Sequence, residues 1–133
     1  MEKIEHIGIA VKDINEANTI YKSLLGYKHY KTENVEREGV TTSFFKCGES
    51  KIELLEATKP DSPIAKFIEK KGEGIHHIAF SVCNIKKEVK RLKEEGFTVI
   101  NEEPKKGADN KLVVFLHPNS TNGVLIELCQ EIE

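Results

Sequence analysis

Apolar and polar residues follow two periods along the chain, and each period predicts one kind of element. Helical spacing occurs twice, at Ile14, Ala17, Ile20, Tyr21 and Leu24 and again at Ile85, Val89 and Leu92. Charged residues lie between these positions, as in a helix that buries one face. Other stretches are short, rich in β-branched and aromatic residues, and bounded by glycines. These stretches predict strands.

The predicted elements occur in the same order twice. Residues 6–11 read His-Ile-Gly-Ile-Ala-Val, and residues 77–82 read His-Ile-Ala-Phe-Ser-Val. A helix-capping residue follows each, Asp13 or Asn84, and each helix is expected to end at a glycine. Three strands then follow in each copy, at 27–35, 40–47 and 51–57 and at 97–102, 112–117 and 124–130. The sequence therefore predicts two β-α-β-β-β modules.

We expect these modules to form one α+β domain over residues 1–133. Module one spans about 3–57, module two about 74–130, and a helix over about 61–71 links them. The length suits one domain with a core of its own. The net charge of -2 gives no reason to expect a nucleic-acid partner. No apolar run predicts a membrane span, and three scattered cysteines are typical of reduced thiols in a cytoplasmic protein.

Each module places a histidine on its first strand and a glutamate on its last. These residues are His6 and Glu53 in module one and His77 and Glu127 in module two. Strand side chains alternate between faces, so each histidine shares a face with small residues such as Gly8 or Ala79, which leaves room for a ligand. An ionised carboxylate within an apolar strand is costly unless a cation pairs with it. A divalent metal at a pseudo-twofold axis would satisfy both glutamates, and the donor set suits Co²⁺, Mn²⁺, Ni²⁺, Zn²⁺ or Fe²⁺.

Four segments resemble the vicinal oxygen chelate superfamily and, within it, the methylmalonyl-CoA epimerase family. They are His6-Ile-Gly-Ile-Ala-Val, Lys51-Ile-Glu-Leu-Leu-Glu, Gly74-Ile-His-His-Ile-Ala-Phe and Phe115-Leu-His-Pro-Asn-Ser-Thr-Asn-Gly-Val-Leu-Ile-Glu-Leu-Cys-Gln. The resemblance spans nearly the whole chain. It implies two modules that form a curved mixed sheet around a central metal site, with His6, Glu53, His77 and Glu127 as ligands.

The resemblance also implies an isomerase that moves the α-proton of an acyl-CoA. It favours Co²⁺ over Zn²⁺, Ni²⁺ or Mn²⁺, and it implies a homodimer. Proton transfer through a metal-stabilised enolate needs carboxylates near the metal. Glu127 is the first candidate and Glu53 the second. Some family members carry a further catalytic glutamate on the third strand, where this chain has Thr42, which cannot act as an ordinary base.

Several polar residues are candidates for substrate binding. Lysines at 105, 106 and 111 could meet coenzyme A phosphates as point charges. Thr42, Asn119 and Ser120 could contact the acyl group.

Three other functions share this fold. Lactoylglutathione lyase (glyoxalase I) has the same ligand pattern, but it would need an arginine-bearing glutathione site, and the chain has only Arg37 and Arg91. A non-catalytic small-molecule binder would often lack the metal ligands. A dioxygenase would need an open site of two histidines and one carboxylate, against which a fourth ligand argues.

Overall fold

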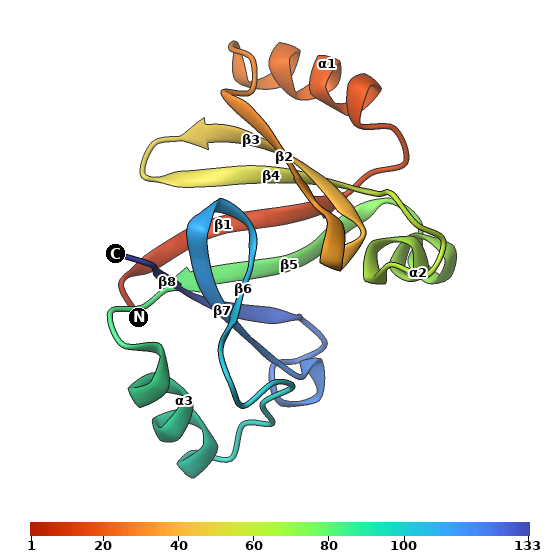
Figure 1. Cartoon of the computed structure of the whole chain (residues 1–133). Coiled ribbons are helices and arrows are strands. Elements are labelled where there is room, and N and C mark those ends of the chain that lie inside the picture. The colour runs from red at the N-terminus through yellow and green to blue at the C-terminus, as the bar shows by residue number, and fades with distance from the viewer. The chain divides into compact units, whose positions relative to one another are not determined.

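A computed structural model describes all residues, 1–133, as eight strands and three α-helices (Figure 1). In chain order the elements are β1 (Lys3–Ala10), α1 (Ile14–Leu25), β2 (Lys31–Val35), β3 (Val40–Cys47), β4 (Ser50–Ala57), α2 (Pro63–Lys71), β5 (Gly74–Ser81), α3 (Ile85–Glu94), β6 (Lys105–Lys106), β7 (Lys111–Leu116) and β8 (Ile126–Glu131). The fold class is α+β, as predicted, and the order β-α-β-β-β occurs twice with α2 between the copies.

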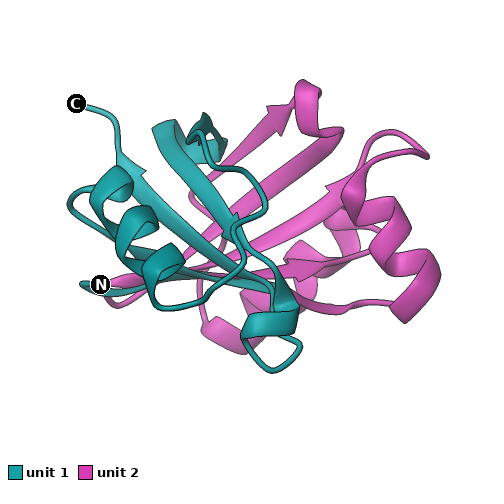
Figure 2. Cartoon of the chain, turned by 90° about the horizontal axis from the view of Figure 1, so that it is seen from below, with its two compact units in different colours: residues 1–6, 77–133 teal, residues 7–76 magenta.

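The chain forms two compact units, drawn in two colours in Figure 2. Unit 1 comprises residues 1–6 and 77–133, and unit 2 comprises residues 7–76. The boundary between them divides β1, so the first residues of this strand belong with the second repeat.

Unit 2 is an antiparallel sheet with α1 packed on β3 and β4. β3 lies between β2 and β4, and the N–H of Val11, after β1, donates to the carbonyl of Leu55 on β4. The residues buried between helix and sheet are Val11, Ile14, Ala17, Phe45 and Leu54. Ile14 and Ala17 of the predicted apolar face are buried, and Tyr21 packs against this core. Ile20 and Leu24, which the spacing also placed on that face, are exposed at 55% and 71%.

The ends of α1 follow from its flanking residues. The carboxylate of Asp13 accepts hydrogen bonds from the N–H groups of Asn15 and Glu16, which caps two donors that a helix leaves unpaired. Gly26 ends the helix with φ at 91°, a left-handed conformation that favours glycine.

Unit 1 is a mixed sheet covered by α3. β5 pairs in parallel with β8, and β7 pairs antiparallel with β8 and with the short β6. The start of β1 lies beside β5, where the N–H of Glu2 donates to the carbonyl of Ser81. The core under α3 consists of Val82, Ile85, Val89, Leu92, Val114, Leu116 and Leu128.

Two predicted strands differ from the structure. The strand expected over 97–102 is wrong, because that segment makes only a single bridge, from Val99 to Leu116. The side chain of Asn101 accepts from the N–H of Phe115 and donates to the carbonyl of Val113, so it occupies backbone groups that a neighbouring strand would use. The two-residue β6 pairs with β7 instead.

The other difference is at the start of β2, which begins at Lys31 and not at Tyr27. Before it, the hydroxyl of Tyr27 donates to the carbonyl of Lys46, so a side chain makes the contact with β3 that backbone pairing was expected to make.

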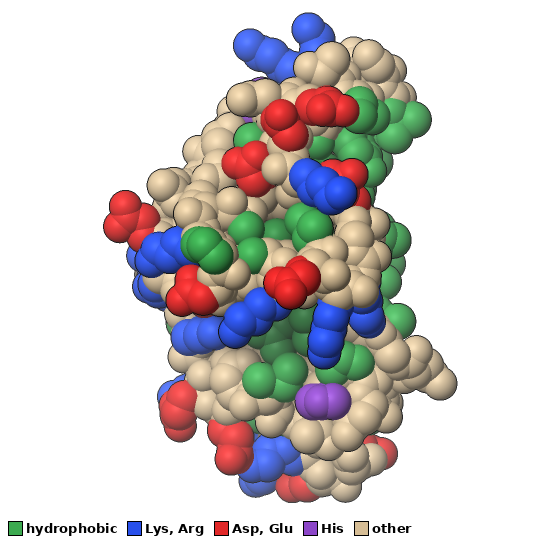
Figure 3. All heavy atoms as spheres, turned by 90° about the vertical axis from the view of Figure 1, so that its right-hand side faces the viewer, with side chains coloured by type: hydrophobic (Ala, Val, Ile, Leu, Met, Phe, Trp, Pro, Cys, Tyr) green, Lys and Arg blue, Asp and Glu red, His purple; other side chains and the backbone are tan.

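The surface mixes both signs of charge. On the face drawn in Figure 3, Lys and Arg side chains lie across the middle, with Asp and Glu side chains above and below them. No helix in the structure has the length and apolar character needed to cross a membrane.

Candidate metal centre

Three of the four predicted ligands come together in unit 1. His6 lies on β1, His77 on β5 and Glu127 on β8, and all three side chains are buried. β5 lies between β1 and β8, and the register of the parallel pair sets Ala79 opposite Glu127. Neighbouring strands therefore bring residues that are far apart in the sequence to one place.

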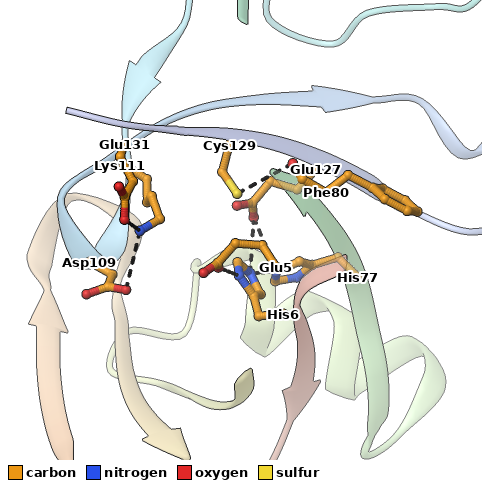
Figure 4. Close-up of polar contacts among 9 residues, drawn as sticks. All are labelled: Glu5, His6, His77, Phe80, Asp109, Lys111, Glu127, Cys129 and Glu131. Atoms are coloured by element: carbon orange, nitrogen blue, oxygen red, sulfur yellow. Dashed lines mark hydrogen bonds and ion pairs between the residues drawn. The ribbon is translucent and has the colours of Figure 1, made fainter. Parts of the chain in front are cut away.

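The donor atoms of these residues face one another (Figure 4). The Nε2 atoms of His6 and His77 are 3.0 Å apart. The carboxylate Oε1 of Glu127 lies 3.2 Å from Nε2 of His77 and 3.7 Å from Nε2 of His6. Two imidazole nitrogens and one carboxylate oxygen thus lie within 4.8 Å of one another.

Burial and the neighbouring imidazoles act on Glu127 in opposite directions. Burial of the carboxyl group raises its pKa, whereas hydrogen bonding and charge interaction with His6, and then with His77, lower it. The combined effect of the imidazoles is larger than that of burial, so the pKa of Glu127 lies well below the usual range for glutamate. The carboxylate is therefore ionised at neutral pH, which is the form that binds a metal.

The donor set of this centre fits a divalent transition metal. Imidazole and carboxylate ligands suit Zn²⁺, Co²⁺, Ni²⁺, Mn²⁺ and Fe²⁺, and three convergent donors leave positions for a further ligand and for substrate. Glu53, the predicted fourth ligand, is buried on β4 and belongs to unit 2. Its membership of the ligand set stays a prediction.

The sequence analysis missed Glu5. This residue precedes a ligand in the chain, is buried, and places Oε1 at 2.6 Å from Nδ1 of His6 (Figure 4). A carboxylate directly before a metal-binding histidine was the available signal. Strand alternation hid it, because consecutive side chains are expected on opposite faces.

The prediction that small residues leave the histidine face unfilled is wrong at Ala79. This residue is fully buried in a small cluster with Val113 and Cys129, and Phe115 packs against the cluster. Larger side chains on β7 and β8 fill the space that Ala79 leaves. The ring of Phe115 also lies 6.0 Å from that of His77, in an edge-to-face arrangement, and so forms an apolar wall beside the ligands.

The residues proposed for substrate binding lie in several places. Lys111 is buried, and its ammonium group pairs with Glu131 and Asp109 at the wall of a cavity of about 770 Å³. Lys105 and Lys106 are exposed on β6. Asn119 and Ser120 belong to a turn of 3₁₀-helix over Pro118–Ser120, and Thr42 is buried on β3 of unit 2. Their contacts with substrate stay predictions.

Comparison with known proteins identifies relatives of this chain. The family model described as Glyoxalase/Bleomycin resistance protein/Dioxygenase superfamily matches residues 5–115. The uncharacterized protein YqjC of Bacillus subtilis (strain 168) is 42% identical over 98% of this chain and 93% of its own length. The ethylmalonyl-CoA/methylmalonyl-CoA epimerase of Cereibacter sphaeroides is 42% identical over 96% of this chain and 97% of its own length.

A solved structure gives the same result for the fold. A variant of Streptomyces coelicolor methylmalonyl-CoA epimerase in complex with 2-nitronate-propionyl-CoA superimposes with a TM-score of 0.94 at 34% identity, over 98% of this chain and 95% of that one. The predicted vicinal oxygen chelate fold is confirmed. The chain belongs to the Glyoxalase/Bleomycin resistance protein/Dioxygenase superfamily, and within it the chain is homologous to methylmalonyl-CoA epimerases.

Proposed function

We propose that this protein is a divalent-metal-dependent epimerase that interconverts (2R)- and (2S)-methylmalonyl-CoA. The observation that carries the proposal is the convergence of His6, His77 and Glu127 in a chain homologous to methylmalonyl-CoA epimerases. The reaction class follows from the substrate, whose α-hydrogen lies between a thioester and a carboxylate. Removing that proton from one face and returning one to the other inverts the centre.

The metal centre suits this chemistry. When bound, a divalent ion would supply Lewis-acid stabilisation of the enolate that forms as the α-proton leaves. A neutral imidazole ligand carries no charge, so His6 and His77 would hold the ion without cancelling its positive charge. The ring of Phe115 beside His77 limits water on that side, and exclusion of water strengthens charge interactions at the centre.

Glu127 and Glu53 are the proposed proton carriers. Glu127 is ionised at neutral pH and lies beside both histidines, so it is placed to accept a proton from a substrate held there. Inversion of the α-carbon calls for a second proton carrier on the opposite face of the substrate. Glu53 fills that role in the proposal, since the third-strand position carries Thr42.

The proposal extends to the setting of the enzyme. Co²⁺ is the proposed native metal, with Zn²⁺, Ni²⁺ and Mn²⁺ as the alternatives that the same donors accept. We further propose a cytoplasmic homodimer whose acyl-CoA substrate meets Lys105, Lys106 and Lys111 through its phosphates.

The test is the exchange of the α-proton, followed by NMR in D₂O with Co²⁺-loaded protein and methylmalonyl-CoA. We expect deuterium to enter the α-position at a rate proportional to enzyme concentration, and the epimers to interconvert. A parallel reaction contains the glutathione hemithioacetal of methylglyoxal. Turnover of the hemithioacetal without exchange of methylmalonyl-CoA would replace the proposal with lactoylglutathione lyase, and binding without turnover of either would make the protein a non-catalytic binder.

A further inference from the structure

The burial pattern of β1 departs from simple alternation at one place. Lys3 and Ile4 are exposed, but the next two residues, Glu5 and His6, are both buried at 5% exposure. Consecutive residues of a regular strand point to opposite faces, so Glu5 would be expected to turn away from His6. Its carboxylate turns back instead and reaches the imidazole ring, with 2.6 Å between Oε1 and Nδ1 (Figure 4).

This contact determines which nitrogen of His6 points at the candidate metal centre. In its neutral form, which is the form that ligates a metal, the imidazole of His6 carries one proton, and a carboxylate only accepts hydrogen bonds; in that form the proton lies on Nδ1, and Nδ1–H donates to Glu5. Nε2 then keeps its lone pair. That atom faces Nε2 of His77 and the carboxylate of Glu127 at the candidate metal centre.

From this geometry we infer that Glu5 is a positioning residue for the metal centre. It holds His6 in the Nδ1–H tautomer, fixes the rotation of the ring, and raises the donor strength of Nε2 through its negative charge. The inference rests on the proposed metal centre and adds to it a residue outside the four predicted ligands.

A contact that serves only the fold would not require this orientation. A buried ion pair can be replaced by apolar residues of similar size with little loss of stability, so its presence alone says little about stability. What distinguishes Glu5 is the direction in which the ring is held. The nitrogen distal to Glu5 points at two other buried donors on β5 and β8.

The experiment compares Glu5→Gln and Glu5→Ala with wild type and with the control Glu2→Gln. Glu2 lies just before the same strand and its variant makes the same change in charge, but its carboxylate contacts Ser81 and Cys83 and not His6. Co²⁺ affinity is measured by competition with a chelator. The tautomer of His6 is read from the ¹⁵N chemical shifts of its ring in the metal-free protein, a signal that a purely structural role of Glu5 would not move.

We expect Glu5→Ala to weaken Co²⁺ binding by about 10- to 100-fold and to move the proton of His6 from Nδ1 toward Nε2. Glu5→Gln should lose less, because its amide oxygen still accepts from Nδ1–H, and Glu2→Gln should stay within about twofold of wild type. If Glu5→Ala does not fold, the smaller loss and the ¹⁵N shifts of Glu5→Gln decide.

The inference would be overturned if both Glu5 variants bound Co²⁺ with an affinity within twofold of wild type. It would also be overturned if His6 of the metal-free wild type carried its proton on Nε2. Either result would leave the proposed function standing. Absence of Co²⁺ binding by the wild type would overturn the proposed function together with the inference.

Discussion

The two units hold different shares of one repeated pattern. Each repeat supplies a histidine and a glutamate, but the boundary between the units falls directly after His6 and directly before His77. Unit 1 therefore contains both histidines and Glu127, within 4.8 Å of one another, while unit 2 contains Glu53. The sequence repeats and the compact units thus divide the chain differently. Three of the four predicted ligands lie in one compact unit, although they come from both repeats.

The two repeats also differ in how completely they form their sheets. In unit 2 the central strand β3 pairs along its length with β4, whereas in unit 1 the edge strand β6 has two residues. The reduced strand carries none of the predicted ligands. β5 and β8, which carry His77 and Glu127 in unit 1, form four residue pairs, one before and two after the pair that holds Glu127. The difference predicts that changes in unit 1 affect metal binding most.

The largest effect is expected for the histidines of unit 1. His6→Ala and His77→Ala each remove one of three convergent donors and leave the buried carboxylate of Glu127 with one imidazole neighbour instead of two. Each should abolish tight Co²⁺ binding. Equilibrium dialysis with metal analysis measures the bound Co²⁺, which should be about one ion per chain in wild type. His117→Ala is the control, because His117 caps a turn on the same unit through the N–H of Asn119. A Co²⁺ affinity unchanged from wild type in both histidine variants would contradict the proposed metal centre.

The next effect concerns the two glutamates, one from each unit. If Glu127 moves a proton, Glu127→Gln should lower epimerisation by about 10² to 10⁴ while keeping some metal, since an amide oxygen can still ligate. Glu53→Gln should keep most activity if Glu53 is only a ligand, because the amide oxygen of glutamine can still ligate the metal. The measurement is the rate of deuterium entry at the α-carbon, taken separately from (2R) and (2S) substrate.

The stereochemistry of exchange sharpens this comparison. If the two glutamates act on opposite faces of the substrate, each variant should retain α-proton exchange from one epimer only. Full activity in Glu127→Gln would remove Glu127 from the proton path.

The sequence was sufficient for the parts of the structure that depend on local pattern. The repeat and the helices follow from period and capping, and they occur where they were expected. The repeat also predicted that His6, His77 and Glu127 would lie together, as they do, and their role as metal ligands stays a prediction. The strand over 97–102 failed because the amide of Asn101 competes for the backbone of β7, a contact between segments that no local pattern encodes. Glu5 was missed for a similar reason, since its role depends on a side chain that turns back against strand alternation.

Metal should stabilise the protein through unit 1. Binding to the folded state alone raises the free energy of unfolding by about 2.7 kcal/mol when free metal is 100 times the dissociation constant. We expect the melting temperature at neutral pH to rise with Co²⁺ and to return when a chelator is added. The gain should fade at acidic pH, where protonated histidines no longer ligate. His77→Ala is the control and should show no metal-dependent shift, whereas a wild-type melting temperature indifferent to the chelator would count against the centre.

The stability of the metal-free protein should depend on pH through Glu127. Its pKa is lowered in the folded state, after the opposing effect of burial, by His6 and His77. As pH falls through the usual range for glutamate, about 4 to 5, the carboxyl group is protonated in the unfolded chain before it is protonated in the folded protein. The contribution of Glu127 to the free energy of unfolding is therefore present above that range and is lost progressively below it. Urea unfolding of wild type and Glu127→Gln, both with chelator, should show a stability difference that shrinks as pH falls. A difference that stays constant from neutral pH to about pH 3.5 would show that the folded-state pKa of Glu127 is not lowered.

The smallest expected effect compares the caps of the two repeated helices. Asp13 accepts from two backbone N–H groups at the start of α1 in unit 2, whereas the amide oxygen of Asn84 accepts from one, that of Lys87, at the start of α3 in unit 1. Loss of a cap costs about 0.5–2 kcal/mol, so both Asp13→Ala and Asn84→Ala should lower the free energy of unfolding. Asp13→Ala should cost more, because its charged oxygen serves two donors and also meets the positive end of the helix dipole. Urea unfolding at neutral pH measures both, with Asp13→Asn as the variant that keeps a capping oxygen and removes the charge. Equal losses in Asp13→Ala and Asn84→Ala would show that the second hydrogen bond of Asp13 adds nothing to the stability of α1.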